Sequence, residues 1–357
     1  MDGPPQALLL RGLASSFVRG LRPRPSLQAV NRFWAATPDL NFLRRSAGLT
    51  VVAVALGVVS GAAVRLTGSG LGCSDWPTCT STSVLAPLQY HAWVEFGNRL
   101  VNVLITVGVL LTALAALRRR PRRRDISGWA AAVVAGILGE VVLGGETVLH
   151  KLAPPWVMAH FLLGIALLMA AVMLYHRSTQ PEVGLSDGSE GRTRVAPATC
   201  LVRPAHLVAA RTMLALSVLV VVLGTVVTST GPHAGAPGVA RFKLSLHTVA
   251  QLHGTSVELL LALTVGTLWS LHRARVAAVV LSRAEILLCV LVAQAAVGYA
   301  QYLTGDPVLL VAVHVAGATM VVIAMMAFNL SLYARGGVAA VQTVAQGDER
   351  ARELVSM

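Results

Sequence analysis

Charge is scarce in this chain of 357 residues. Only 13% of the residues are charged, against roughly a quarter in a soluble domain. Aromatic residues reach only 5%, while hydrophobic residues make up 55% and the mean hydropathy is +0.68. The apolar residues stand in blocks of about twenty, which is the length that crosses a bilayer core. This composition excludes an ordinary soluble domain and indicates a polytopic membrane protein whose helices are mostly Ala, Val, Leu and Gly.

Acidic residues are fewer than basic ones, and the net charge is +13. The basic residues cluster in alternate loops, as in 118–125 and 271–283, and Arg44 and Arg45 precede the first apolar block. The loop 231–245 is an exception to this alternation. Such clustering follows the positive-inside bias of membrane proteins. We therefore expect membrane lipid, and no nucleic acid, around this chain, with both termini inside.

The apolar blocks predict an all-α integral membrane protein with eight transmembrane helices. We expect them at 47–66, 91–117, 127–147, 155–176, 211–230, 247–271, 283–303 and 308–334.

The helices divide into two four-helix bundles, because a segment rich in Gly, Ser, Pro and charge separates the fourth from the fifth. We expect a first bundle over 46–177, a flexible inside linker over 178–210 and a second bundle over 211–335. Residues 336–357 form a C-terminal tail, and residues 1–45 form a basic N-terminal arm. The arm is also loosely similar to a transit peptide.

The two bundles repeat a pattern. Gly144 precedes His160 by sixteen residues in the first bundle, and Gly298 precedes His314 by the same sixteen residues in the second. An even number of helices gives both halves one orientation. We therefore expect a parallel repeat with a pseudo-two-fold axis along the membrane normal.

The repeat places four side chains at similar depth: Asn98 and His160 in the first bundle, and His253 and His314 in the second. Two inward histidines on facing helices are typical of heme iron ligation from both sides. Zinc is an alternative, although it requires more ligands than this pair offers. Asn98 stands where the second bundle has a histidine, and asparagine is a poor iron ligand. The first bundle therefore predicts a heme held by His160 alone, with the opposite face open.

His91, Glu95 and Asn98 share one stripe of a helix. Loss of water around a carboxylate disfavours its charged form, which suits Glu95 to proton transfer. The alternative is a pair between Glu95 and Arg99 that only neutralises both charges.

Two of the four cysteines, Cys73 and Cys79, lie in a loop broken by Gly and Pro. On an oxidising side of the membrane this pair predicts a disulfide. The alternative is a thiol pair that exchanges its redox state.

Several strings together resemble the heme A synthase family. They are "VRLTGSGLGCSDWPTC" (64–79), "EFGNR" (95–99), "GGETVL" (144–149) and "AH" (159–160) in the first half, with "LHG" (252–254) and "VH" (313–314) in the second. The similarity covers residues 45 to 335, so the arm and the linker lie outside it or interrupt it.

The resemblance implies an oxidoreductase that converts the C8 methyl group of heme O to a formyl group, giving heme A. It implies heme b as cofactor, with its iron between His253 and His314, and heme O as substrate. The substrate heme site of the family maps onto Asn98 and His160, and its functional glutamate maps onto Glu95.

The resemblance also assigns the arginine of the family motif E-x-x-H-R to Arg99, and the outer-loop cysteine pair to Cys73 and Cys79. The motif reads E-F-G-N-R here, so its histidine is missing at Asn98. His91, on the same stripe, is the alternative ligand, but at about 10 Å along the helix axis it would require a shifted heme. His91, Glu95 and Asn98 are expected to form the polar wall of the substrate heme pocket, with Arg99 paired with a carboxylate. The loop 231–245 also lacks the cysteine pair that some family members carry there.

Heme O synthase is the expected heme donor, and a quinol or a ferredoxin-like protein the expected electron donor; a homo-oligomer is also considered. The expected location is the bacterial plasma membrane, with the mitochondrial inner membrane as alternative. Two other classes remain open: a di-heme b electron-transfer protein linked to quinol, and a transporter.

Overall fold

The computed structural model describes residues 38–120, 122–180, 186–187, 192–193 and 198–334. In this part of the chain, eight helices are long and apolar enough to cross a membrane, so the chain is a multi-pass membrane protein. The helices are α3 (Leu40–Leu66), α4 (Tyr90–Arg118), α5 (Arg124–Leu149), α6 (Pro154–Thr179), α7 (Pro204–Thr230), α8 (Leu246–Arg273), α9 (Ala278–Leu303) and α10 (Val308–Ser331). Four two-residue strands accompany them: β1 (Ser186–Asp187), β2 (Arg192–Thr193), β3 (Thr199–Cys200) and β4 (Tyr333–Ala334).

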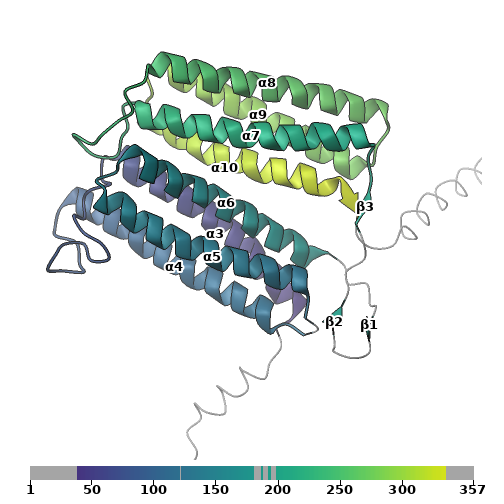
Figure 1. Cartoon of the computed structure of the whole chain (residues 1–357), viewed down its shortest axis with the longest axis horizontal. Helices are drawn as coiled ribbons and strands as arrows, with labels where there is room; N and C mark the ends of the chain where they lie inside the picture. The colour runs from purple at the N-terminus through teal and green to yellow at the C-terminus, as the bar shows by residue number, and fades with distance from the viewer. Residues whose placement is uncertain (1–37, 121, 181–185, 188–191, 194–197, 335–357) are drawn as a thin grey trace, which may run out of the picture.

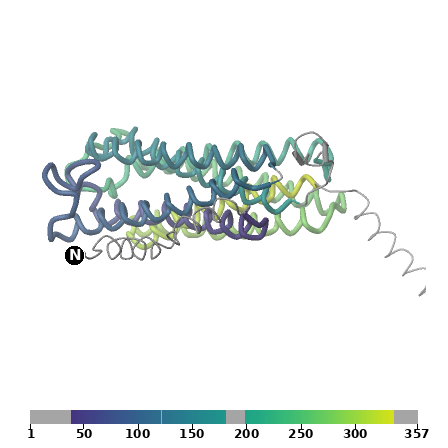
Figure 2. Tube along the Cα trace, turned by 90° about the horizontal axis from the view of Figure 1, so that it is seen from below, coloured from purple at the N-terminus to yellow at the C-terminus, as the bar shows by residue number. Residues whose placement is uncertain are grey.

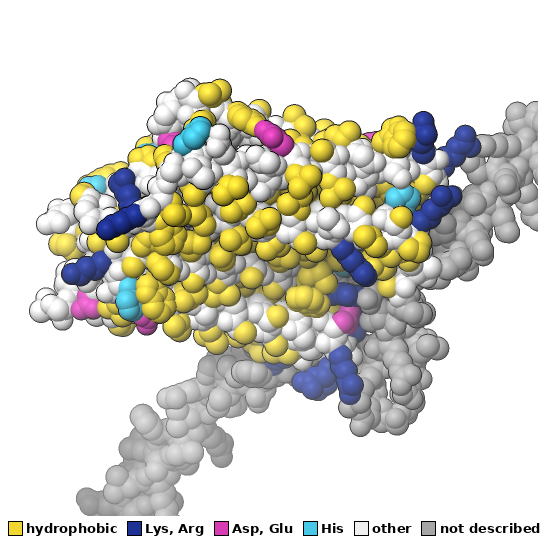
Figure 3. Space-filling view, turned by 45° about the horizontal axis from the view of Figure 1, so that its top comes forward, with side chains coloured by type: hydrophobic (Ala, Val, Ile, Leu, Met, Phe, Trp, Pro, Cys, Tyr) yellow, Lys and Arg dark blue, Asp and Glu magenta, His cyan; other side chains and the backbone are white. Residues whose placement is uncertain are grey.

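The outer surface of the helices is apolar. Even in α6, the most enclosed helix, only 44% of the apolar window is buried within the protein. Figure 3 shows hydrophobic side chains over the middle of one face, with Lys and Arg toward its two ends. This distribution matches a helix bundle whose middle faces lipid and whose ends face water.

The helices pack in two groups of four (Figure 1). In one group α3 contacts α4 and α6, and α5 contacts α4 and α6; in the other, α8 contacts α7 and α9, and α10 contacts α7 and α9. Each group has its own apolar core, centred on residues such as Leu168 and Ile126 in the first and Met325 and Phe328 in the second. Helix α10 also packs against α3 and α6, so it joins the two cores.

Helix ends differ from the expected ones where polar residues continue or stop the backbone pattern. Helix α10 ends at Ser331 rather than at 334, because Tyr333–Ala334 pairs antiparallel with Thr199–Cys200. Helix α7 begins at Pro204, inside the segment expected as a linker, and α3 begins at Leu40, inside the expected arm. Apolar blocks mark the lipid-facing length, whereas helical hydrogen bonds continue to a residue such as Pro that cannot extend them.

One end of the molecule carries the long connections 67–89 and 231–245, which are hydrogen-bonded to each other (Figure 2). The N–H of Gly70 donates to the carbonyl oxygen of Gly235 at 2.9 Å. A Cβ on Gly70 would lie 2.8 Å from a methyl group of Leu152, so only glycine fits between these segments. We call this end the loop end.

Arg65, at the end of α3, bonds to the other half of the chain. Its Nε donates to the carbonyl oxygen of His233, and its Nη2 donates to that of Thr228, both at 2.6 Å. The ring Nε2 of His233 in turn donates to the carbonyl oxygen of Asp306, at 2.8 Å. These bonds connect α3, the end of α7 and the turn between α9 and α10.

The turns that precede α6 and α10 have the same backbone conformation. Each has two successive residues with positive φ, Lys151 and Leu152 in one turn and Gly305 and Asp306 in the other. The N–H of Leu152 donates to Thr147 O, and that of Asp306 to Gln301 O, at 2.8 and 2.9 Å.

We expect Arg65→Ala to lower the free energy of unfolding by about 1.5–3 kcal/mol, because hydrogen bonds from a charged group are lost between the two halves. Arg65→Lys retains the charge but cannot donate to two carbonyl oxygens in the same geometry. Its free energy of unfolding should therefore lie between those of Arg65→Ala and the unmodified protein. Chemical unfolding in detergent would measure both variants.

The matched control is Arg241→Ala, which removes an exposed arginine that donates to Pro232 O in the same loop end. Its effect should stay within about 0.5 kcal/mol. Equal effects of the two alanine variants would contradict the assigned role of Arg65.

Candidate functional site

Glu95 is buried near the start of α4, with 5% of its surface exposed. One carboxylate oxygen accepts the backbone N–H of Cys73 at 2.8 Å. The other accepts the Arg99 guanidinium at 2.7 Å. The Glu95–Arg99 ion pair considered from the sequence is therefore present, and Glu95 additionally binds the loop.

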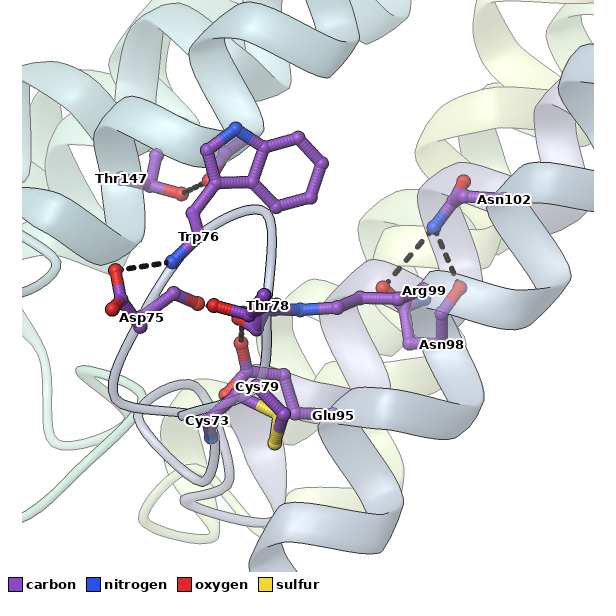
Figure 4. A network of polar contacts seen from close by, with 11 residues as sticks. Cys73, Asp75, Trp76, Thr78, Cys79, Glu95, Asn98, Arg99, Asn102 and Thr147 are labelled. Atoms are coloured by element: carbon purple, nitrogen blue, oxygen red, sulfur yellow. Dashed lines mark hydrogen bonds and ion pairs between the residues drawn. A yellow bond between two sulfur atoms is a disulfide. The ribbon is translucent and has the colours of Figure 1, made fainter. Parts of the chain in front are cut away.

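Arg99 holds the same loop (Figure 4). Its guanidinium donates to the carbonyl oxygens of Thr78 and Asp75, at 2.9 and 3.0 Å, while also bonding Glu95. It also lies over the ring of Trp76, 5.4 Å from the ring centroid, within the range of a cation–π contact. One helix thus positions the loop through an acid and a base one turn apart.

Cys73 and Cys79 form a disulfide, and both are almost fully buried. The predicted pair is therefore confirmed in its disulfide form. Cβ atoms at two glycines would collide with this region: one on Gly72 would lie 2.2 Å from the carbonyl oxygen of His91, and one on Gly145 would lie 2.4 Å from the Trp76 ring. These glycines let the loop pack directly on α4 and α5.

The other two polar residues of the α4 stripe have separate partners. His91 is exposed, and its Nδ1 lies 2.9 Å from the Ser69 hydroxyl at the loop end. The Asn98 amide donates to the Ser60 hydroxyl of α3 at 2.9 Å and accepts from the Asn102 amide at 3.1 Å. Asn98 is thus part of a hydrogen-bonded contact between α3 and α4.

In the second bundle, the rings of the two histidines expected to bind iron lie close to each other. The ring centroids of His253 on α8 and His314 on α10 lie 6.3 Å apart. An iron about 2 Å from each of two imidazole nitrogens separates the ring centroids by roughly 6 Å, so the spacing suits one iron between them.

Hydrogen bonds select which nitrogen is available on these rings. His253 Nδ1 lies 3.1 Å from the carbonyl oxygen of Val220, which can only accept, so Nδ1 carries the proton and Nε2 is available to iron. The amide nitrogen of Gln294 on α9 lies 3.1 Å from His314 Nδ1 and 2.8 Å from the His314 carbonyl oxygen. Both rings are thus held by neighbouring helices.

Glycines on the neighbouring helices make room for the rings of all three histidines, His160, His253 and His314. A Cβ on Gly224 would lie 3.2 Å from His253 Cε1, and one on Gly298 would lie 2.9 Å from His314 Cε1. The corresponding distance from Gly144 to His160 Cε1 is 3.4 Å. The glycine sixteen residues before each of two histidines in the sequence thus provides the space for its ring.

His160 on α6 has an acidic neighbour, Glu140 on α5, which the sequence analysis did not single out. Glu140 Oε2 lies 3.1 Å from His160 Nδ1, although the two are not aligned as a hydrogen bond. The signal that could have found Glu140 is its position one helical turn before Gly144, where an acidic residue interrupts an apolar helix.

A zinc centre is not supported in the described ranges, since no group of three or more His, Cys, Asp or Glu there could hold a metal ion. The groups that the structure offers are the imidazoles of His160, His253 and His314, together with the buried carboxylate of Glu95 under a loop closed by a disulfide.

A family model described as COX15-CtaA, cytochrome oxidase assembly protein, matches residues 44–89 and 82–326. A protein of Geobacillus kaustophilus named "Heme A synthase" is 32% identical over 156 residues, which are 43% of this chain and 48% of that protein. A protein of Shewanella oneidensis with the same name is 30% identical over 159 residues, covering 40% of this chain and 47% of the relative. The chain therefore spans about half the length of these curated relatives.

We expect the free energy of unfolding of the double variant Cys73→Ser, Cys79→Ser to be lower by about 2 kcal/mol. The disulfide closes a short loop and so lowers the conformational entropy of the unfolded chain, and this effect is lost in the variant. A reductant should lower the stability of the unmodified protein to the same level. Unfolding in detergent with and without reductant would measure both.

Cys200→Ser is the control, because Cys200 is an exposed cysteine outside the disulfide. Its stability should match that of the unmodified protein. If reductant left the unmodified protein unchanged, the disulfide would not contribute as stated.

Proposed function

Because this chain belongs to the COX15-CtaA family of cytochrome oxidase assembly proteins, we propose that it is a heme A synthase, which oxidises the C8 methyl group of heme O to a formyl group. The observation that carries the proposal is the pair of imidazoles at 6.3 Å in the second bundle. The names of the relatives support the same activity.

His253 and His314 would hold a heme b, with Nε2 of His253 toward its iron. The 6.3 Å spacing of their rings and the glycines behind them fit this group. When bound, heme b supplies one-electron transfer to the substrate site. Direct helix contacts hold the two ligands: α7 with α8, and α9 with α10.

The substrate heme O would occupy the first bundle, with His160 as the protein ligand of its iron. The Asn98 side then leaves space for oxygen or water, since the Asn98 amide already bonds Ser60 and Asn102. With O2 as the oxidant, each oxidation would use two electrons from the donor and two protons and would release one water. The methyl group would become first a hydroxymethyl group and then a geminal diol. Loss of water from the diol leaves the formyl group.

Glu95 would handle protons or position the reacting edge of the substrate. Its burial and its bond to the Cys73 N–H hold the carboxylate at a fixed place below the disulfide loop. Arg99 compensates the negative charge. His91 contacts Ser69 at the loop end, so in this proposal it belongs to the rim of the site rather than to the iron.

The proposal includes a parallel repeat of the two bundles with both termini inside. The matching turns before α6 and α10 support the repeat, because corresponding residues have the same unusual backbone conformation. We place the protein in the bacterial plasma membrane, which the bacterial relatives support. Delivery by heme O synthase, a quinol or ferredoxin-like electron donor and a homo-oligomer stay predictions.

A di-heme electron-transfer protein is the second candidate, since two heme sites are also its requirement. Asn98 argues against an electron-transfer protein. An electron-transfer heme normally has two strong axial ligands, whereas the Asn98 amide is hydrogen-bonded to Ser60 and Asn102.

The test is to express the protein in a host that supplies heme O, extract the non-covalent hemes and separate them by chromatography with mass detection. Heme A, or its hydroxylated precursor, beside heme b supports the proposal. Heme b alone, at two per chain with heme O available, contradicts it and favours electron transfer.

Glu95→Gln should reduce heme A formation by about 10²–10⁴-fold, the usual contribution of a group that transfers protons in the reaction. The amide still accepts from the Cys73 N–H, so both heme sites should stay loaded. The same extraction measures product and loading together.

Glu285→Gln is the matched control, since Glu285 is an exposed acid that pairs with His272 on the far side of the second bundle. It should form heme A normally. Normal heme A formation by the Glu95 variant would remove Glu95 from the mechanism.

Gly298→Ala should weaken heme b binding, because the new methyl group would lie 2.9 Å from His314 Cε1 and displace the ring. Overpacking of this kind costs about 1–3 kcal/mol, equivalent to roughly 5–150-fold in affinity. Titration of the heme-depleted protein with heme B, followed by absorbance, measures the change.

Gly266→Ala serves as the control, because nothing lies within 4 Å of a Cβ placed there. Its heme affinity should equal that of the unmodified protein. Equal affinities for both alanine variants would show that the close packing of His314 is unnecessary for binding.

A further inference from the structure

Glu140 and Gln294 occupy corresponding places in the two bundles. Each lies one helical turn before the glycine that packs against the histidine of the next helix. Each is also the neighbour of that histidine's Nδ1: Glu140 Oε2 at 3.1 Å from His160, and Gln294 Nε2 at 3.1 Å from His314. The two bundles thus have the same support for a ligand histidine, but with a carboxylate in one and an amide in the other.

This exchange changes what the support can do. An amide carries both donors and an acceptor, so it can satisfy either tautomer of an imidazole without adding charge. An ionised carboxylate only accepts, so it pairs with a ring that carries its proton on Nδ1. That tautomer leaves Nε2 as the ring nitrogen that can bind iron. A carboxylate partner also makes the ligand more basic.

The Glu140 carboxylate has a hydrogen-bonding oxygen without a partner. Glu140 Oε1 and His160 Nδ1 are both buried and lack a hydrogen-bond partner among the residues that the structure describes. Unsatisfied polar groups in a membrane interior are costly and are usually retained for a task. Since Oε2 already lies 3.1 Å from Nδ1, a small rotation of the imidazole would form the bond.

The first bundle also differs from the second on the side of the heme site opposite His160. The repeat places Asn98 where the second bundle has His253, and the Asn98 amide bonds Ser60 and Asn102. The first bundle thus lacks one strong ligand and has a carboxylate behind the other. A five-coordinate iron with one strongly donating imidazole would result from these two differences together.

We propose that Glu140 is a positioning residue that holds His160 in the Nδ1–H tautomer and strengthens its bond to the iron of the heme in the first bundle. This inference rests on the proposed heme site but not on its oxidation chemistry. Gln294 gives His314 a neutral partner, so the two hemes differ in ligand strength as well as in ligand number.

The experiment compares Glu140→Gln with the unmodified protein, both loaded with heme in the full chain. In ferrous protein, the iron–histidine stretching band in resonance Raman spectra arises from the five-coordinate heme, so it reports on His160 alone. We expect this band to be present in the unmodified protein and to move to lower frequency in the variant. An absent band, or an unchanged frequency in the loaded variant, would overturn the proposal.

Redox titration gives a second readout. We expect Glu140→Gln to reduce the preference of the five-coordinate site for ferric over ferrous iron about tenfold, the lower end of the usual effect of such partners. For a one-electron couple this corresponds to a potential higher by about 59 mV. The six-coordinate heme should keep its potential. Glu146→Gln, on the same helix but paired with His150, should change neither readout.

If Glu140→Gln does not retain heme in the first bundle, Gln294→Glu tests the same principle. A carboxylate behind His314 should lower the potential of the six-coordinate heme by about 59 mV, again for a tenfold change. No decrease would overturn the proposal.

Neither readout requires turnover, so the two proposals can fail separately. Shifts in the expected direction, in a protein that makes no heme A, would leave this inference standing and contradict the proposed function. Normal heme A formation with no shift in the Raman band or the potential would support the proposed function and contradict the role of Glu140.

Discussion

The close packing of an imidazole against a glycine of the neighbouring helix is the contact on which the rest of this structure depends. It occurs at His160, His253 and His314, whose rings would each lie within 3.4 Å of a Cβ placed on the neighbouring glycine. In lipid, helices associate through such close packing and through hydrogen bonds, because burying apolar surface gains little there. The same contact therefore joins two helices and fixes the position of the histidine ring.

The loop end is organised by a different force. The Glu95–Arg99 pair is buried, and its remaining hydrogen-bonding groups are used to hold backbone atoms of the 67–79 loop. A buried ion pair alone contributes little to stability, because removing two charges from water offsets their attraction. Here the additional backbone bonds convert the pair into an anchor, and the disulfide restricts the loop that it holds.

Much of the fold could be predicted from the sequence. Apolar blocks of membrane length predicted all eight described spans. Helix ends were less predictable, since the strand pair β3–β4 shortens α10 and helical hydrogen bonding extends α7 back to Pro204.

The site was only partly predictable. Residue type and spacing singled out His253 and His314, whose ring centroids lie 6.3 Å apart in an edge-to-face arrangement, and the disulfide of Cys73 and Cys79. Helical spacing predicted that His91, Glu95 and Asn98 share one face of a helix. It could not show that their partners differ, namely Ser69, the Cys73 N–H and Ser60. Glu140 was missed because a single acid in an apolar helix reveals no partner until the neighbouring helix is in place.

The position of α10 has a consequence for the movement of charge through the molecule. Helix α10 carries His314 and packs directly against α6, which carries His160. Packed helices have axes about 8–10 Å apart. If the proposed hemes are held by these two residues, an electron passing between them would cross the single interface of α6 and α10. The joining of the two cores by α10 would then keep the electron path between the halves short.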